Sequence, residues 1–572
     1  MITPIRIKDY EIKTASNRNF RGITSLDLAL GDTTVLIGEN NTGKTAVLDA
    51  LRFALRDIRS RRGCAFDAYD FHLQRATSEP TSSPAIGIRL TFREDVAGDW
   101  GDKRLARLDR AKIAQIDSNG CATVILKVGA RFDSTKQEFV QDWEFQNLDG
   151  APLTGVADIA VGILQSEVSY YYLAALRDAA RHFDAKGTFW RPFLKESQLT
   201  AEKRIEIETK LSELNDLIIS SHASFSQVVS RLTEVKNVVS MYGEDLVSID
   251  AVPERLFDML AKAQVNLNTD TGAKIPVRRH GEGIQSLAVL TLFNAFLQAW
   301  NKGDPIVALE EPEAHLHPSA VRALWLLIEK IPGQKIISTH SGDLLSEVPS
   351  EAVIRLYKAA GVVSASRLKD VNLSFDDTRK FNFHIRRARG ELLFARCWIL
   401  GEGETEATLI TEVARDLNKD LERAGVRFVA YQAGVSLETC LRVANGLGIH
   451  WVVLADNDGQ GAQNRAIVRK YLNGRLEDDT LFMMEENNIE QHLCCNGFAD
   501  VYFNLLSSQP RSKVTVPPQD TDYPIQVANA LPPYLKTRAA QDVLSAIRNN
   551  HHSVPRLFQD LIETALILAE DK

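Results

Sequence analysis

The sequence predicts an α/β protein made of two α/β units, with a long helical segment inside the first. Three observations lead to this expectation. The short apolar run at residues 33–37 is followed by a glycine-containing loop and by helical apolar spacing over residues 46–55. Helix and strand patterns alternate over residues 280–350, and a second alternating pattern begins near Cys397. Residues 168–265 lie between these patterns and are expected to be mostly helical.

Composition narrows the possible classes of protein. The chain has 572 residues, of which 44% are hydrophobic and 25% charged, so it has ordinary globular composition and room for about three to four domains. It contains no apolar run of 18 residues and no secretory signal at the N-terminus, so no membrane span is expected. Six cysteines without CxxC pairs indicate reduced thiols and a cytoplasmic protein. The net charge of −8 argues against an overall basic, nucleic-acid-coating surface.

The remaining segments follow from local patterning. Residues 85–150 contain alternating stretches that predict antiparallel strands. Residues 375–392 are polar and basic and are expected to form a linker. Residues 500–533 hold six of the 19 prolines and are expected to be rich in loops, before a helical tail.

The helical block carries an apolar seam whose steps alternate between four and three residues. Only one serine interrupts it, so the seam stays on one face of a helix or helical hairpin. An intramolecular bundle and a dimerisation element both explain such a face. The seam consists of Ile207, Leu211, Leu214, Ile218, Ser221, Phe225, Val228, Leu232, Val235 and Val239.

A phosphate-binding motif follows the first apolar strand. The sequence from Gly38 to Thr45 fits GxxxxGK[ST], and it opens a predicted helix, which is the context that this motif requires. Backbone N–H groups of Asn40, Asn41, Thr42 and Gly43 would surround phosphates at the helix N-terminus. Lys44 would reach the β- and γ-phosphates, and Thr45 would ligate Mg²⁺. The motif therefore predicts ATP binding.

An acidic strand end supports the nucleotide site. Residues 306–309 form an apolar run that ends in Glu310 and Glu311, the pattern of a Walker B strand. Glu310 would help to hold Mg²⁺, although Asp is usual there, and Glu311 would polarise the attacking water. A second strand, over residues 335–339, ends at His340, a candidate sensor of the γ-phosphate.

The order of these motifs is that of ABC-type ATPases. A glycine-rich helix start, with Gly283 and Gln285, precedes the acidic strand, and Lys44 and Glu310 are separated by a large insertion. In ABC-type ATPases this segment caps the ATP held by the other subunit, so the order predicts a homodimer. A plain helix N-cap loop explains the same glycines and remains open.

Two further strands end in acids. Residues 397–400 lead to Glu402, and residues 451–455 lead to Asp456 and Asp458, which strand alternation would point the same way. Carboxylates at the carboxyl ends of neighbouring strands suit Mg²⁺, and more than two acids suit a pair of metal ions that cleaves a phosphodiester.

Glu402 followed by the Asp456–Asp458 pair is the pattern of the Toprim domain. An ABC-type ATPase followed by Toprim resembles the OLD (overcoming lysogenisation defect) family of ATP-dependent nucleases, which includes the Gabija nuclease subunit. The resemblance covers nearly the whole chain and is specific at residues 391–406 and 310–318. Gly401, where the family often has Val, and the degenerate glycine-rich segment depart from it.

The resemblance implies roles for individual residues. Glu402 and Glu406 match two metal-binding glutamates, and Asp456 and Asp458 match the DxD pair. Glu490 resembles a later metal acid, and Lys536 resembles a lysine that stabilises charge on the phosphate, although an ordinary surface lysine explains Lys536 equally well. The implied catalytic set is Glu402, Glu406, Asp456, Asp458, Glu490, Lys536 and Glu311.

These expectations divide the chain into an ATPase part over residues 1–167, a helical dimerisation insertion over 168–265, the rest of the ATPase over 266–390 and a Toprim nuclease domain over 391–572. The implied function is a metal-dependent DNA endonuclease regulated by ATP, with Mg²⁺ or Mn²⁺, in anti-phage defence. Arginines at 56, 59, 61 and 62 and at 386, 387 and 389 are candidate DNA contacts, and a solvated charged surface explains them equally well. Homodimers or larger homo-oligomers are expected, and a helicase-like protein or a retron remains open as a partner. The alternative is an SMC-like DNA-binding or signalling ATPase whose Toprim domain docks partners.

Overall fold

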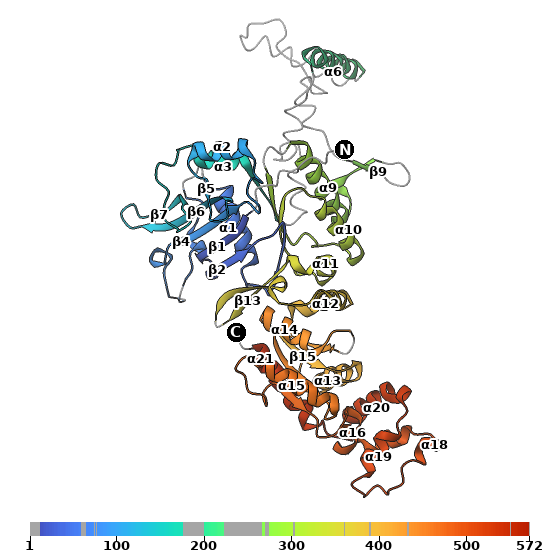
Figure 1. Cartoon of the computed structure of the whole chain (residues 1–572). Coiled ribbons are helices and arrows are strands. Elements are labelled where there is room, and N and C mark those ends of the chain that lie inside the picture. The colour runs from blue at the N-terminus through green and yellow to red at the C-terminus, as the bar shows by residue number, and fades with distance from the viewer. Residues whose placement is uncertain are drawn as a thin grey trace, which may run out of the picture. The chain divides into compact units, whose positions relative to one another are not determined.

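The computed structural model (Figure 1) describes most of the chain as two compact units. The described residues are 12–58, 64–73, 75, 77–174, 200–221, 266–268, 274–300, 304–359, 361–387, 390–431, 434–549 and 551–570. Unit 1 comprises residues 1–170, 306–308 and 333–572, and unit 2 comprises residues 171–305 and 309–332. This partition is not the four-part division expected from the sequence, which stays a prediction.

An antiparallel sheet in unit 1 confirms the strands expected over residues 85–150. Its order is β2-β1-β4-β6-β5, and β7 pairs with β6. Every second residue of β4 is buried, as expected of a strand with one face on the core. The strands are β1 (Ile12–Phe20), β2 (Ile23–Ala29), β4 (Ile86–Arg93), β5 (Gln115–Ile116), β6 (Ala122–Asp133) and β7 (Glu138–Gln146), with helices α2 (Asp102–Ala111) and α3 (Ala160–Glu167).

A second sheet carries the predicted nucleotide motif. Its order is β14-β13-β3-β12-β11-β8, and β3 runs parallel to both β12 and β13. Five of the six residues of β3 are buried, which is typical of a strand covered on both faces. The elements are β3 (Thr33–Gly38), β8 (Val168–Ala174), β11 (Asp304–Glu310), β12 (Gln334–Ser338), β13 (Val353–Ala359) and β14 (Val362–Arg367), with α1 (Lys44–Leu55) and α11 (Gly342–Glu347).

The C-terminal part of unit 1 has a four-stranded parallel sheet in the order β16-β15-β17-β18. All five residues of β15 are buried, and α21 packs on β15 and β17 (Figure 1). The strands are β15 (Cys397–Gly401), β16 (Val426–Ala430), β17 (His450–Ala455) and β18 (Leu481–Met483). The helices are α13 (Glu404–Asp416), α14 (Leu437–Leu447), α15 (Gly459–Lys470), α16 (Ile489–Leu493), α17 (Ala499–Leu505), α18 (Ser508–Arg511), α19 (Tyr523–Ala530), α20 (Lys536–Arg548) and α21 (Arg556–Glu570).

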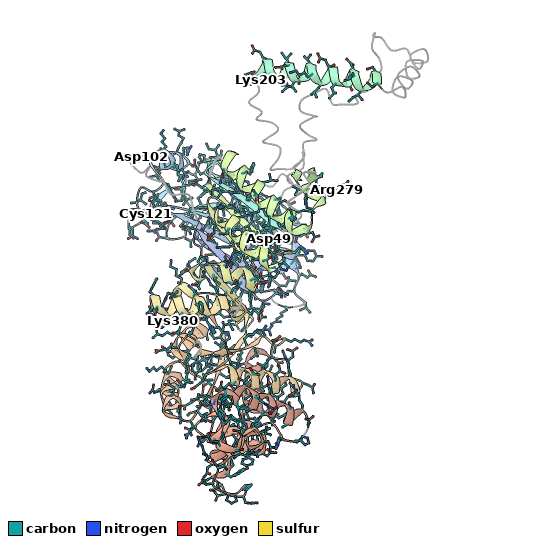
Figure 2. All side chains as sticks on the ribbon, turned by 90° about the vertical axis from the view of Figure 1, so that its right-hand side faces the viewer. Asp49, Asp102, Cys121, Lys203, Arg279 and Lys380 are labelled. Carbon is teal, nitrogen blue, oxygen red and sulfur yellow. The ribbon has the colours of Figure 1, made fainter. Side chains whose placement is uncertain are left out.

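Unit 2 is mainly helical in its described part. The helix α9 buries Val289, Leu290, Phe293 and Leu297, which recur on one helical face, and it packs against α10. The elements are α6 (Ala201–Ser221), α9 (Glu282–Trp300), α10 (Pro318–Glu329), β9 (Asn266–Asn268) and β10 (Lys274–Pro276). Lys203 marks α6 in Figure 2.

Three expectations about local structure are wrong. Residues 375–387 form the helix α12 (Phe375–Arg387) rather than a linker, because Phe381 and Ile385 lie one turn apart and are both buried. The block expected to be helical from residue 168 begins with the strand β8, which contains three tyrosines, a residue type favoured in strands. The proline-rich residues 500–533 include most of α17 and all of α18 and α19, since proline is tolerated in a first helical turn, as in α19.

Some sequence features lie partly outside the described residues. Of the apolar seam, only the positions from Ile207 to Ser221 lie in α6, and the later positions from Phe225 to Val239 are not described. Among the candidate DNA contacts, residues 59, 61, 62 and 389 are likewise outside the described part. Across the residues that the structure does describe, every helix is too short or too polar to cross a bilayer.

Candidate nucleotide and metal sites

The loop between β3 and α1 has the backbone of a phosphate-binding loop. Gly38, Asn41 and Gly43 all have positive φ values, of 145°, 66° and 92°. A Cβ atom on Gly38 would lie 2.2 Å from the carbonyl oxygen of Leu356 in β13, so only glycine fits there. The local sequence thus bends the chain sharply between a buried strand and a helix N-terminus, as the motif predicted.

The P-loop lysine is held inside the loop. Lys44 is buried, and its Nζ donates to the backbone oxygens of Gly38, at 2.9 Å, and Glu39, at 2.7 Å. Thr42 Oγ1 donates to the same Glu39 oxygen at 2.8 Å. The ammonium is therefore already positioned at the concave side of the loop, where phosphate oxygens would replace these carbonyls.

An ion-pair network fixes the helix that follows the loop. Arg21 pairs with Asp49 of α1 at 2.6 Å and with Asp70 at 2.9 Å, and both carboxylates are buried (Asp49 is labelled in Figure 2). Removal of one partner from such a buried pair leaves an uncompensated charge. The network therefore holds α1, and with it Lys44 and Thr45, in place.

His340 lies on the same cavity as the P-loop. It follows β12, which is paired in register with β3, so that both strands end at one edge of the sheet. A cavity of about 620 Å³ is lined by Gly38, Glu39, Asn40 and His340 together with basic side chains of the C-terminal part. The structure thus brings His340 to the loop, as the sequence predicted for a γ-phosphate sensor.

The acidic strand end and the glycine-rich segment belong to unit 2. Glu310 closes β11 and accepts a hydrogen bond from Tyr172 Oη at 2.5 Å, and the next residue, Glu311, is exposed with a φ of 44°. Gly283 and Gln285 lie in the first turn of α9, where Gln285 Nε2 donates to the oxygen of His280 at 2.6 Å. These four residues occupy the strand end and helix start that the motifs predicted.

In the C-terminal sheet, acids gather at one edge. Because β15 and β17 are adjacent and parallel, Glu402 and Asp456 follow the carboxyl ends of neighbouring strands. We define the acid cluster as Asp456 together with the four carboxylates whose charges raise its pKa, which are Glu402, Glu406, Asp458 and Glu490. The sequence predicted these five residues.

Strand alternation does not place the DxD pair. The strand β17 ends at Ala455, so both aspartates lie in the following turn. Asp458 caps α15 by accepting from the N–H of Gly461 at 2.8 Å, and Glu406 accepts from the N–H of Gly403 at 2.9 Å. Hydrogen bonds to backbone N–H groups at helix starts, rather than a common strand face, therefore orient Asp458 and Glu406.

Two side chains that sequence reasoning missed hold Glu402. Tyr431 Oη donates to Glu402 Oε1 at 3.3 Å, and Asn464 Nδ2 donates to the same oxygen at 3.2 Å and to Tyr431 Oη at 3.0 Å. Burial and the charge of Glu402 raise the pKa of Tyr431, so its hydroxyl stays a donor. The position of Tyr431 directly after the mostly apolar strand β16 was the available signal, whereas nothing local marks Asn464.

The acid cluster concentrates negative charge. Burial raises the pKa of Asp456 to about 7, and four neighbouring carboxylates add to the shift: Glu402, Glu406, Asp458 and Glu490. Burial, and then the charges of Glu402 and Glu490, also raise the pKa of Glu406. A divalent cation would relieve this repulsion.

The cluster suits a metal that keeps water or substrate ligands. Within the described ranges, no three His, Cys, Asp or Glu side chains stand together as a complete metal-binding group. Mg²⁺ usually binds through one or two carboxylates, with waters and substrate phosphates as the remaining ligands. The donor set therefore fits an ion completed by water and phosphate oxygens.

Glu490 and Lys536 form a pair beside the cluster. Glu490 lies in the first turn of α16, which Asn488 caps, and it is buried. Lys536 begins α20, and its Nζ lies 2.9 Å from Glu490 Oε1. The structure brings these two predicted residues together, with the half-exposed ammonium available to a phosphate.

Two protein-family models match this chain. Residues 14–391 match the family model described as "Protein of unknown function (DUF2813)". The chain belongs to this family. Residues 393–458 match the model described as "Overcoming lysogenization defect protein-like, TOPRIM domain". The resemblance to the OLD family and the fold class, an ABC-type P-loop ATPase followed by Toprim, are confirmed.

Relatives of this DUF2813 chain match it over most of their lengths. The uncharacterized protein YbjD of Escherichia coli K12 is 29% identical over 503 residues, which cover 85% of this chain and 87% of the relative. Endonuclease GajA of Bacillus cereus is 23% identical over 77% of this chain and 74% of its own. The OLD nuclease of Thermus scotoductus is 24% identical over 80% of this chain and 83% of its own length.

Proposed function

We propose that this protein is an ATP-binding, metal-dependent DNA endonuclease that acts in anti-phage defence. The observation that carries the proposal is the acid cluster at the edge of a Toprim sheet in a chain that also has a preformed P-loop. The names of the relatives GajA and OLD nuclease support the class of reaction.

Each residue of the acid cluster has a part in the proposed reaction. Glu402, Glu406, Asp456, Asp458 and Glu490 would hold Mg²⁺ or Mn²⁺, which when bound supplies an activated water and stabilises the leaving oxygen. Tyr431 and Asn464 fix the orientation of Glu402. Lys536 would place positive charge on the scissile phosphate. DNA therefore meets a local array of acids and one lysine rather than a basic surface.

The nucleotide site would regulate this centre. Lys44 and the P-loop amides would bind the phosphates of ATP. Thr45 and Glu310 would bind the Mg²⁺ of the nucleotide, and His340 would contact the γ-phosphate. Glu311 would orient water, and Gly283 with Gln285 would cap the nucleotide of a second subunit. We therefore propose a cytoplasmic homodimer or larger homo-oligomer, in which the part of residues 168–265 that follows β8 serves dimerisation. A helicase-like protein or a retron would be a further partner.

Plasmid cleavage tests the proposal. Supercoiled DNA is incubated with the protein and Mg²⁺ or Mn²⁺, with and without ATP, and nicked and linear products are measured. The wild type is expected to cut, and Glu402→Ala and Asp456→Ala are expected to lose at least about 100-fold in rate, because loss of even an outer partner of a metal ligand costs up to about 100-fold. Intact DNA under all conditions, or normal cutting by both variants, would refute the nuclease.

One observation favours a second function, that of an SMC-like DNA-binding or signalling ATPase. Asp458 is engaged as a helix cap and Glu490 is paired with Lys536, so part of the acidic charge is already satisfied without metal. Calorimetry of Mn²⁺ binding separates the two functions. If the wild type binds Mn²⁺ and Asp458→Ala does not, the result supports the nuclease. If the wild type does not bind Mn²⁺, the result supports the docking role.

A further inference from the structure

A residue of the P-loop is joined by an ion pair to the Toprim part of unit 1. Both carboxylate oxygens of Glu39, the second residue of the loop, accept from Arg396: one from Nε and the other from Nη2. The two residues are 357 positions apart in the chain and are each about one-third exposed. Such a two-point arginine–carboxylate contact defines distance and orientation, which a single-point contact does not.

The P-loop side of this pair includes the contacts that a phosphate would compete for. Lys44 Nζ and Thr42 Oγ1 both donate to the backbone oxygen of Glu39. A bound triphosphate would take the ammonium of Lys44 for its own oxygens and would bring negative charge next to the carboxylate of Glu39. Both effects act on the residue that holds Arg396.

The other side of the pair leads directly into the acid cluster. Arg396 immediately precedes β15, whose last residue is followed by Glu402. Its backbone N–H donates to the oxygen of Gly425 at 2.7 Å, and its own oxygen accepts from the N–H of His450, the first residue of β17, at 2.9 Å. Arg396 is therefore connected to both strands that end at the acids Glu402 and Asp456.

A second arginine makes this connection rigid. Arg355 of β13 is buried, and its register partner in β3 is Ile37, next to the P-loop. Its guanidinium donates to four backbone oxygens of the C-terminal part at 2.8–3.2 Å: those of Leu393, Ala395, Leu447 and Gly448. Burial lowers the pKa of Arg355 to about 10, so it stays charged at neutral pH. The P-loop strand pair is thus joined by direct hydrogen bonds to the backbone around Arg396.

We propose that the Glu39–Arg396 pair couples occupancy of the P-loop by a nucleoside triphosphate to the position of β15 and Glu402. Arg396 is a positioning residue, and Glu39 is the residue through which nucleotide acts on it. The inference rests on the proposed nuclease function and adds the route of its regulation. Linkage requires the coupling to be reciprocal, so metal at the acid cluster also changes the affinity for nucleotide.

Hydrogen exchange tests the coupling without relying on catalysis. Amide exchange of the peptide covering residues 397–406 is measured by mass spectrometry with and without ATP and Mg²⁺. In the wild type we expect ATP to change the exchange rate at least about fivefold, the lower end of typical coupling. In Arg396→Gln we expect a change below about twofold, with ATP binding retained, and Glu39→Gln should lose the response to ATP in the same way. Arg423→Gln, in the same cavity, is the matched control and should respond like the wild type.

Each outcome decides the matter. The inference is overturned if the peptide does not respond to ATP in the wild type, or if Arg396→Gln responds fully. Arg396→Gln leaves the P-loop sequence intact, so it decides the case if Glu39→Gln binds ATP poorly. Plasmid cleavage is run in parallel, where the fold-change caused by ATP should fall in both variants. If the peptide responds in the wild type but DNA stays intact, the coupling stands and the nuclease function fails.

Discussion

Single side chains set the charge balance of the acid cluster. Asp456 is half-buried and has four carboxylate neighbours, and burial first, then these charges, raise its pKa to about 7. Lys536, paired with Glu490, offsets part of this negative charge. The metal-free fold therefore bears a repulsion that metal binding would remove, as is common where function competes with stability.

Asp456→Asn should stabilise the metal-free protein. Because the folded-state pKa lies above 3.8, the favourable contribution of the protonated side chain is present below about pH 4 and is lost as the pH rises through about 7. At pH 8 with a chelator, the variant should gain about 1 kcal/mol in unfolding free energy, after allowance for solvent screening. Thermal unfolding at pH 5 and pH 8 measures this, with the exposed Asp479→Asn as control. An equal gain at both pH values would contradict the repulsion.

Tyr431→Phe should weaken metal binding without unfolding the protein. The variant loses the hydroxyl that donates to Glu402 and accepts from Asn464, so Glu402 is no longer oriented. We expect Mn²⁺ affinity to fall about tenfold, the lower end for loss of such an outer partner. Calorimetry measures the Mn²⁺ affinity, and circular dichroism checks that the variant is folded. Tyr471→Phe, which removes the same atom from a contact with Arg442 and Glu438, should leave the affinity unchanged.

At the level of elements, the junction of β17 and α15 presents the DxD pair. The chain leaves β17 at Ala455 and starts α15 at Gly459, and the carboxylate of Asp458 caps the helix. The turn is tight because a Cβ atom at position 461 would lie 1.8 Å from the backbone oxygen of Asp456. This glycine is therefore required by a close backbone approach, not by its φ angle.

Gly461→Ala and Gly459→Ala form a matched pair in this turn. At Gly459 a Cβ atom would meet no atom within 4 Å, so alanine there should be neutral or stabilise α15 by about 0.5 kcal/mol. At Gly461 the turn must open, which should cost about 2 kcal/mol and abolish Mn²⁺ binding. Urea denaturation and calorimetry compare the two variants. If both behave alike, the close approach does not determine the turn.

For unit 1 as a whole, Arg355 holds the ATPase sheet to the Toprim sheet. Four backbone oxygens accept hydrogen bonds from this one buried guanidinium, and all of them belong to residues that shortly precede β15 or β17. Without it, these buried acceptors have lost their donor, which is more costly than the loss of a surface hydrogen bond. The two sheets should then unfold less cooperatively.

Arg355→Met tests this role. We expect the free energy of unfolding to fall by about 3 kcal/mol or more, and the single urea transition to separate into two. Tryptophan fluorescence can follow the unfolding, since Trp398 and Trp451 lie in the C-terminal sheet. Lys358→Met, in the same strand, is the control and should cost less than 1 kcal/mol. A single transition shifted no further than that of Lys358→Met would contradict the role of Arg355.

The nucleotide motif was predictable because it is local. The run from Gly38 to Thr45 contains the strand end, the glycines with positive φ and the helix start within eight residues. The linker expected at residues 375–392 was wrong for the opposite reason. Its polar composition hid the two buried positions, Phe381 and Ile385, that pack the helix α12.

The sequence by itself determined which chemistry this protein carries: a P-loop with Lys44, an acidic strand end with Glu310, and the acids around Glu402 and Asp456. Each is a short pattern whose geometry depends on neighbours in the chain. Only the tertiary structure decided which side chains orient and connect these motifs, namely Tyr431, Asn464, Arg355 and the Glu39–Arg396 pair. Their partners lie tens to hundreds of residues away, and only the packing of strands brings them within hydrogen-bonding distance.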